Sequence, residues 1–283
     1  MPLKIGLTLG GGSARGWSHV GVLRALEERG VRPDVVCGTS AGALVGAAYV
    51  LGQLDDFEHW LGSLEKRDVL SYFDFSLTGG VLKGQRIFDL FSLHVEDRPI
   101  ESLPIPFGAV TTDLENGTEV WLRRGSLRTA VRASISVPAL FTPVQVEGRW
   151  CIDGSLSNPV PVALCRALGA ETVIAVDVNG GLLGQQRSFS QEGEPTLLEV
   201  AERALHMTQA RLTRPRLAAD PPDLLITPET GSIGFIEFHR AQEAFEAGRK
   251  SVEALSDELA RCLKAAGAQP AEPSQNTDRH RLQ

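Results

Sequence analysis

The sequence contains little of three features that would place it in a special class: cysteine, excess basic charge and long apolar runs. It has four cysteines in 283 residues. They show neither the spacing of a metal site nor the density of a disulfide framework. We therefore expect reduced thiols, no metal and no cofactor. The four residues are Cys37, Cys151, Cys165 and Cys262.

Charge and hydrophobicity exclude two further classes. With 28 lysines and arginines against 35 acidic residues, the formal net charge is −7, which disfavours binding to nucleic acid and permanent attachment to anionic lipid. The longest apolar stretch, Ala41–Gly52, is too short and too rich in glycine to span a bilayer, and the N-terminus lacks the apolar core of a signal peptide. We therefore expect a cytoplasmic protein that is at most peripheral to the inner face of the membrane.

Glycine, by contrast, is plentiful. Two early clusters of it each lie between a predicted strand and the predicted helix that follows. In chain order, the N-terminal part predicts a strand, a helix, a second strand and a second helix, over Lys4–Leu9, Trp17–Arg29, Val31–Cys37 and Ala41–Leu51. This β-α-β-α order predicts a parallel sheet covered by helices.

The remainder of the chain predicts further hairpins and helices. One hairpin is expected over Asn116-Gly117, a pair typical of a type I′ turn, and another around Glu147-Gly148. The predicted strands are 107–113, 118–122, 143–146, 149–152, 171–178 and 223–228. The predicted helices are 55–66, 84–94, 126–134, 159–168, 195–217 and 239–266, and 180–194 is a polar loop. We expect a single domain over 1–267 and a disordered tail over 268–283.

A glycine-x-serine-x-glycine pattern, Gly38-Thr39-Ser40-Ala41-Gly42, lies between the second predicted strand and the helix after it. In that context the pattern is typical of a nucleophile elbow, a tight turn that holds a serine in strained backbone with its hydroxyl outward. The following helix directs its N-terminal N–H groups at the reacting oxygen. The same residues also fit a plain cap on a closely packed helix, and the pattern alone leaves both interpretations open.

The earlier glycine cluster, over Gly10–Gly16, also follows a strand and opens a helix. Its backbone N–H groups can form the oxyanion hole that a nucleophilic serine requires, if neighbouring parallel strands bring the two turns together. A dinucleotide-binding loop is the competing interpretation. It is disfavoured because the glycine spacing fits in neither register, no acidic residue ends the second strand, and Ser40 occupies the place of the ribose.

The base that would activate Ser40 is not an obvious histidine. None of the six histidines falls in a glycine-rich turn or at a strand end. Asp153 does stand at a strand end, in the segment CIDGS. It is either an ordinary Asp-Gly turn or the base of a Ser-Asp dyad. Because an exposed aspartate has a pKa of about 3.9, a dyad requires a buried carboxylate whose pKa is raised.

Five segments together resemble the patatin-like phospholipases, in their bacterial single-domain branch. In chain order they are LGGGSARGWSHVGVLRAL, VVCGTSAGALVGAAY, TTDLENGT, AVRASISVPALFTPV and WCIDGSLSNPVP, and the resemblance falls between Leu3 and Val178. It implies a three-layer α/β/α fold with a mostly parallel central sheet. It also implies a Ser-Asp dyad that cleaves the acyl esters of phospholipids or lysophospholipids.

The resemblance further implies roles for individual residues. Ser40 matches the nucleophile, with Gly38 and Gly42 flanking it in the elbow. Asp153 matches the carboxylate of the dyad. The oxyanion loop falls on Gly11, Gly12, Ser13 and Arg15.

Two residues depart from the family pattern, and a third is unusual for its position. Ser13 replaces the usual third glycine of the loop, and its N–H stays available unless the backbone there requires a positive φ. Ser155 replaces the small apolar residue or glycine that usually follows Asp-Gly. Arg15 is a cation near a helix start, which is unfavourable, so we expect it to hold the loop or to meet a phosphate group. Asp113 and Arg132 are expected to be structural partners.

The substrate is less defined than the site. Aromatic residues are concentrated over residues 57–93, and they form either core or an acyl-chain wall in a lid over residues 54–100. The leading hypothesis is a hydrolase of lipid acyl esters that contacts a membrane surface transiently. The alternatives are a general esterase or acyltransferase on small acyl donors, and a regulatory protein that keeps the fold with little turnover.

Overall fold

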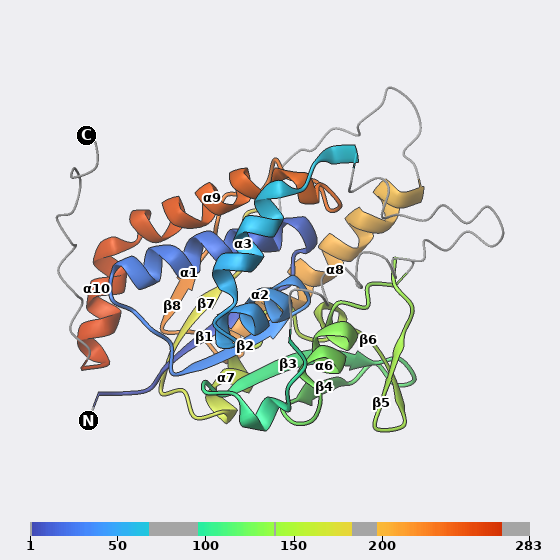
Figure 1. Ribbon diagram of the computed structural model, residues 1–283, viewed down its shortest axis with the longest axis horizontal. Coiled ribbons are helices and arrows are strands. Elements are labelled where there is room, and N and C mark those ends of the chain that lie inside the picture. Colours follow the sequence, from blue (N-terminus) through green and yellow to red (C-terminus); the bar gives the residue numbers. More distant parts are fainter. Residues whose placement is uncertain (1, 68–95, 139, 183–196, 268–283) are drawn as a thin grey trace.

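The computed structural model describes residues 2–67, 96–138, 140–182 and 197–267, which form a central sheet between two layers of helices (Figure 1). Three predictions fall outside the described residues: the helix 84–94, most of the polar loop 180–194 and the disordered tail 268–283. Most of the aromatic-rich lid segment, residues 68–95, also lies outside them.

The sheet is mixed but mostly parallel, and this confirms the predicted fold class. Its strands run in the order β5-β6-β3-β2-β1-β7-β8, with β4 paired to β3 off this path. Strands β3, β2, β1, β7 and β8 are parallel to one another, whereas β4, β5 and β6 pair in antiparallel fashion. The strand bounds are Ile5–Leu9 (β1), Val35–Thr39 (β2), Phe107–Asp113 (β3), Glu119–Leu122 (β4), Val144–Val146 (β5), Arg149–Asp153 (β6), Thr172–Val176 (β7) and Leu224–Ile226 (β8).

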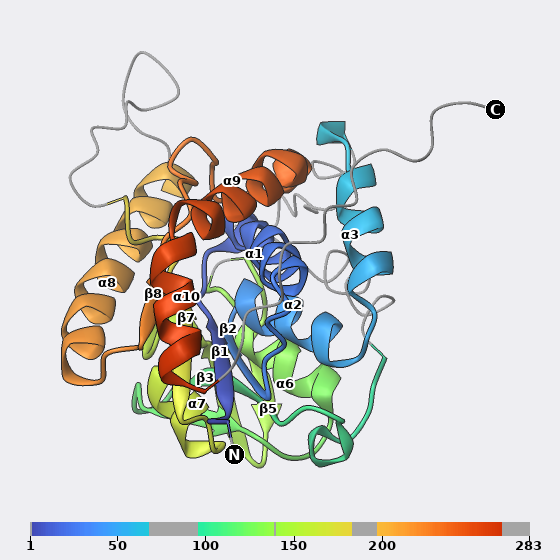
Figure 2. The same ribbon diagram turned by 90° about the vertical axis from the view of Figure 1, so that its left-hand side faces the viewer.

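Helices cover both faces of this sheet, which explains why its central strands are buried along their whole length (Figure 2). Helices α1, α2 and α9 pack over the larger apolar core on one face, and α7 and α8 lie over a smaller core on the other. The helix bounds are Ser18–Glu28 (α1), Ala41–Val50 (α2), Leu54–Ser63 (α3), Leu127–Ser134 (α6), Val162–Ala167 (α7), Leu197–Ala219 (α8), Ala241–Ala254 (α9) and Ser256–Ala265 (α10), with short 3₁₀ turns at Ser13–Trp17, Ile100–Ser102, Gly154–Leu156 and Phe238–Arg240. Among the described helices, none is both long and apolar enough to cross a membrane.

The prediction of one continuous C-terminal helix over 239–266 is wrong. The chain bends at Leu255, whose N–H bonds to the carbonyl of Val252 in a tight 3₁₀ contact, and α10 begins at the next residue. Helix α9 packs on α1, whereas α10 buries Leu259 and Leu263 and contacts β8. One straight helix could not bury its apolar side against both neighbours.

Two turn predictions have different outcomes. The hairpin between β5 and β6 places Glu147 (φ 49°) and Gly148 (φ 81°) in the left-handed region, the pattern of a type I′ turn. The hairpin between β3 and β4 forms as predicted, but its turn is not type I′, because only Gly117 has a positive φ. Asn116 instead accepts a bond at Oδ1 from the N–H of Thr118, which stabilises a longer loop.

The described part of the aromatic-rich segment belongs to the core. Phe57 on α3 is fully buried and meets Trp17 edge to face, with ring centroids 6.0 Å apart. Trp60 packs against Phe57 at 5.8 Å. For these two residues, core packing is therefore the correct interpretation.

Two glycines allow α1 and α9 to pack closely, far apart in sequence but side by side in space (Figure 1). A Cβ atom on Gly21 of α1 would lie 1.9 Å from the carbonyl oxygen of Phe245. A Cβ atom on Gly248 of α9 would lie 2.0 Å from the carbonyl oxygen of Ser18. The contact is reciprocal, so each helix tolerates no side chain at its contact point.

We expect Gly21→Ala and Gly248→Ala each to destabilise the fold by about 1–3 kcal/mol, because the new methyl group meets backbone that cannot move aside. Urea unfolding measures this loss. Gly62→Ala in α3 is the matched control, since its Cβ would meet only the flexible end of Gln242. Stabilities of all three variants equal to wild type would contradict the close helix contact.

Candidate active site

Ser40 occupies a strained turn between β2 and α2. Its backbone angles, φ 53° and ψ −123°, lie in a region that non-glycine residues rarely adopt and that costs about 1–3 kcal/mol. The turn is closely packed: a Cβ on Gly38 would lie 2.4 Å from the backbone nitrogen of Ala43, and one on Gly42 would lie 2.1 Å from the carbonyl oxygen of Leu9. Small flanking residues are therefore required here by the approach of neighbouring backbone.

Ser134, which sequence reasoning missed, supports this turn from α6. The backbone N–H of Ser40 donates to Ser134 Oγ at 2.8 Å, and that hydroxyl donates in turn to the carbonyl of Val110 at 2.6 Å. The strained backbone is thus tied to β3. No spacing in the sequence marks Ser134, although it lies within one of the segments that carry the family resemblance.

The sheet register brings Asp153 to Ser40. Thr39 pairs with Val110 on β3, and the next residue of β3, Thr111, pairs with Asp153 at the end of β6. The Ser40 hydroxyl donates to Asp153 Oδ2 at 2.6 Å, although the two residues are 113 positions apart. Asp153 is only 2% exposed and Ser40 only 5%. The two side chains therefore meet in a site that is nearly closed to water.

Burial changes the acidity of this carboxyl. Desolvation raises the pKa of Asp153 from 3.8 to about 6, and hydrogen bonds from Ser40 and Ser155 partly oppose the rise. The backbone N–H of Ser155 donates to Oδ1 at 2.8 Å, which leaves Oδ2 for Ser40. At neutral pH the group is a carboxylate with greater proton affinity than an exposed aspartate.

The glycine loop after β1 lies against this pair. A Cβ on Gly11 would come within 3.3 Å of Ser40 Cβ. Gly11 itself donates its N–H to the carbonyl of Pro159 at 3.0 Å. In the described part of the chain, the N–H groups of Gly12 and Ser13 have no acceptor. Of the predicted loop residues, these two therefore hold the donors that remain free for a ligand, and Gly11 supplies close approach.

Ser13 adopts the positive φ that would usually call for glycine. Its φ is 50°, so the serine at this position carries backbone strain. Two backbone hydrogen bonds hold the loop at this position, from the N–H of Ala14 to the carbonyl of Phe235 and from the N–H of Arg15 to the carbonyl of Gly12. The backbone here does have the positive φ expected to make the Ser13 N–H unavailable, but this N–H still has no acceptor among the described residues, so the serine costs some stability without removing the donor.

Arg15 holds the glycine loop in place through contacts of its side chain. The side chain is fully buried; Nε donates to the carbonyl of Ile233 at 2.9 Å, and the guanidinium pairs with Glu202 at 3.0 Å. It also contacts His206 on α8. Of the two roles expected for Arg15, this geometry fits holding the loop. Arg132, expected to be a structural partner, donates to Ser136 Oγ at 2.7 Å.

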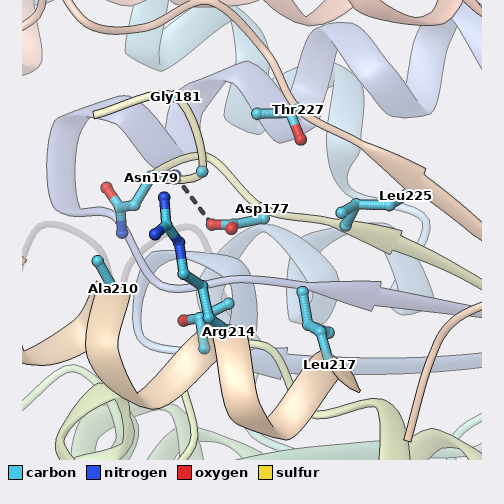
Figure 3. A pocket seen from close by; sticks show the side chains of 10 residues that line it. Asp177, Asn179, Gly181, Ala210, Arg214, Leu217, Leu225 and Thr227 are labelled. Atoms are coloured by element: carbon cyan, nitrogen blue, oxygen red, sulfur yellow. Dashed lines mark hydrogen bonds between the residues drawn. The ribbon is translucent and has the colours of Figure 1, made fainter. Parts of the chain in front are cut away.

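Asn179, also missed by sequence reasoning, connects the loop to a pocket of about 270 Å³ beyond the end of β7. Its side chain donates to the carbonyl of Gly11 at 2.7 Å, and its backbone N–H donates to Asp177 at 3.0 Å. Figure 3 shows Asp177 and Asn179 on one wall of the pocket and Arg214 on α8 opposite. The polar residue directly after a predicted apolar strand was the available sequence signal.

The described histidines do not reach the pair. His19 is buried and bonds through Nε2 to the carbonyl of Gly10 at 2.7 Å, and burial lowers its pKa to about 4. Within the described residues, no histidine hydrogen-bonds to Ser40 or Asp153. In the same residues, no three histidine, cysteine or acidic side chains form a group that could hold a metal ion.

Comparison with known proteins places this arrangement in a family. The family model described as patatin-like phospholipase matches residues 7–166, the part of the chain that carries both Ser40 and Asp153. The chain belongs to this family. The matched segment contains the strained Ser40, the buried carboxylate of Asp153 and the glycine loop.

Two curated relatives extend the match beyond the family model. An NTE family protein of Mycobacterium tuberculosis that has no assigned activity is 33% identical over 321 residues, covering 87% of this patatin-like chain and 89% of the relative. A lysophospholipase of Emericella nidulans is 30% identical over 306 residues, covering 99% of this chain but only 19% of the relative.

A solved structure supports the fold alone. VipD from Legionella pneumophila superposes with a TM-score of 0.57 at 13% sequence identity, covering 90% of this patatin-like chain and 67% of VipD. At that identity the likeness carries no information about substrate or partner.

We expect Asp153→Asn to remove a pH dependence of stability. Because burial raises the folded-state pKa from 3.8 to about 6, the carboxyl stabilises the fold below pH 4, and this contribution is lost as the pH rises through 6. The difference in free energy of unfolding, variant minus wild type, should rise by on the order of 2 kcal/mol between pH 4 and pH 7. Urea unfolding at each pH measures it, and a constant difference would contradict a raised pKa at Asp153.

Proposed function

We propose that this protein is a serine hydrolase that cleaves lipid acyl esters, with Ser40 as nucleophile and Asp153 as its base. The observation that carries the proposal is the hydrogen bond of 2.6 Å between Ser40 Oγ and Asp153 Oδ2 in a buried site. The strained backbone of Ser40 and the free N–H groups of Gly12 and Ser13 support it.

The proposed reaction begins with attack by Ser40. Its oxygen bonds to the carbonyl carbon of the ester while its proton passes to Asp153 Oδ2. The negative charge that develops on the carbonyl oxygen is stabilised by the N–H groups of Gly12 and Ser13. The alcohol leaves with the proton from Asp153, and water then releases the fatty acid from the acylated serine.

The substrate class is proposed from the relatives. Family membership favours a lipid ester, and the lysophospholipase of Emericella nidulans, which aligns with 99% of this chain, favours a lysophospholipid as the first substrate to test. We place the protein in the cytoplasm, in transient contact with the inner membrane surface where such lipids occur.

A labelling experiment separates this function from the alternatives. A fluorophosphonate probe should react with Ser40 in the wild type and not in Ser40→Ala. Hydrolysis of a long-chain lysophospholipid much faster than of a short-chain ester would distinguish a lipid hydrolase from a general esterase. No labelling of a folded wild type would instead favour a regulatory protein with little turnover.

The dyad predicts a non-additive loss of activity. Ser40→Ala and Asp153→Asn should each remove most hydrolysis, by about 10⁴-fold or more, and the double variant should be little worse than either single variant. Two residues that act as one unit cannot each contribute separately. Initial rates of ester hydrolysis, with thermal melting as a check on folding, provide the measurement. Near-normal rates in Asp153→Asn would mean that Asp153 is only a turn residue.

No single histidine should be essential. His19→Gln, His206→Gln and His239→Gln should each retain hydrolysis within about tenfold of wild type, since no proton is transferred through imidazole in this mechanism. A loss of about 10⁴-fold in one of these variants, without unfolding, would indicate a serine–histidine mechanism in place of the dyad.

A further inference from the structure

The hydroxyl of Ser155 is an exception among the buried hydroxyls of the site. Ser155 is 1% exposed, yet its Oγ makes no hydrogen bond of normal geometry in the described part of the chain, although it lies close enough to Asp153 to lower the pKa of that carboxyl. By contrast, Ser134 Oγ donates to Val110, and Ser157 Oγ bonds to Thr112 Oγ1 at 2.8 Å. A buried hydroxyl without a partner is destabilising, so its presence in the resting site requires an explanation.

The position of this hydroxyl is specific. Its backbone N–H already donates to Asp153 Oδ1 at 2.8 Å, so the side chain begins next to the carboxylate. On its other side the hydroxyl contacts the glycine loop, because a Cβ on Gly11 would lie only 2.1 Å from Ser155 Oγ. Ser155 therefore stands between the loop and the carboxylate, and rotation about one side-chain bond redirects its O–H.

The proposed reaction creates a need for a donor at this place. In the resting site Asp153 accepts one bond from the Ser40 hydroxyl and one from the Ser155 N–H. Once Ser40 carries the acyl group, its oxygen has no hydrogen to donate, and the buried carboxylate loses one of these two bonds. The same carboxylate must then keep its orientation to accept a proton from the attacking water.

We propose that Ser155 is a positioning residue for deacylation, whose hydroxyl turns to donate to Asp153 after Ser40 is acylated. It replaces the bond that Ser40 gave and directs Oδ2 toward the water. The water oxygen then bonds to the acyl carbon while its proton moves to Asp153. The bond from the acyl carbon to Ser40 Oγ breaks, Ser40 recovers the proton from Asp153, and the fatty acid leaves. This inference rests on the proposed function.

The charged residues near Asp153 do not explain its shifted pKa. Asp113 on β3, Arg128 and Arg132 on α6, and Arg149 on β6 itself are the charged residues on the strands and helix that pack around Asp153. Helix α8, which contacts the turn after Asp153, carries Glu199, Glu202, Arg203, His206, Arg211, Arg214 and Arg216. The pKa of Asp153 is raised by burial and lowered by hydrogen bonds from the side chain of Ser40 and from the backbone and side chain of Ser155. A change in the pH profile on replacing Ser155 is therefore assigned to its hydroxyl.

Single-turnover kinetics with a p-nitrophenyl ester test the proposal. Release of p-nitrophenol with enzyme in excess gives the acylation rate, and loss of the acyl mass from Ser40, followed by mass spectrometry, gives the deacylation rate. Ser155→Ala should acylate within about twofold of wild type but deacylate roughly ten- to hundredfold more slowly, the effect expected of one hydrogen bond to a charged group. The acidic limb of its deacylation profile should also move to higher pH.

Two further variants separate positioning from structure. Ser155→Cys keeps a weak donor of similar size and should deacylate at an intermediate rate. Ser157→Ala removes a hydroxyl that is bonded in the resting structure, so it should lower the melting temperature without changing the ratio of the two rates. Ser155→Ala, in contrast, should melt no lower than wild type, because the lost hydroxyl makes no hydrogen bond of normal geometry there.

The outcomes that overturn the inference are distinct from failure of the proposed function. Equal deacylation rates in Ser155→Ala and wild type, or equal losses in acylation and deacylation, would assign Ser155 no role in positioning. A wild type that releases no p-nitrophenol and never carries an acyl group on Ser40 would overturn the proposed function, and this inference with it.

Discussion

The hydrogen bond between Ser40 and Asp153 is the interaction on which the rest of the site depends. It requires the ends of β2 and β6 to meet across β3, and the registers of both strand pairs bring them together. A shift of one residue in either pair would turn one of the two side chains to the opposite face. Strand β6 can bring Asp153 to this place because it runs antiparallel to β3, from beyond the end of β2 back to Thr111, one residue past the level of Thr39.

Burial gives this pair its chemistry and also makes it costly. A carboxylate removed from water holds a proton more readily, and the proposed role of Asp153 as base depends on this raised proton affinity. Polar side chains around the pair hold the backbone of the Ser40 turn and of the glycine loop in place. Ser134 holds the backbone of Ser40, Asn179 holds the carbonyl of Gly11, and Arg15 holds the loop beneath. Local strain at Ser13 and Ser40 is thus maintained by contacts from distant parts of the chain.

The features predictable from sequence are those with a local cause. The turn at Ser40 follows from glycines on both sides of a serine between strand and helix, and Asp153 was found because it ends a strand. The roles of Ser134 and Asn179 were not predictable, because each contacts backbone far away in sequence. The bend at Leu255 was not predictable for the same reason. No glycine or proline marks it, and only the separate packing of α9 and α10 requires it.

The anchoring of the glycine loop has a consequence for biosynthesis. Arg15 and Ala14 bond to the carbonyls of Ile233 and Phe235, which are made more than two hundred positions later in the chain. A ribosome-bound chain can complete Ser40 and Asp153 long before those carbonyls emerge from the exit tunnel. Until then the glycine loop lacks its hydrogen bonds to Ile233 and Phe235, and α1 has no α9 to pack against. The nascent chain therefore carries Ser40 and Asp153 before the glycine loop is anchored, and the arrangement of all three is complete only after residues 233–235 have been made.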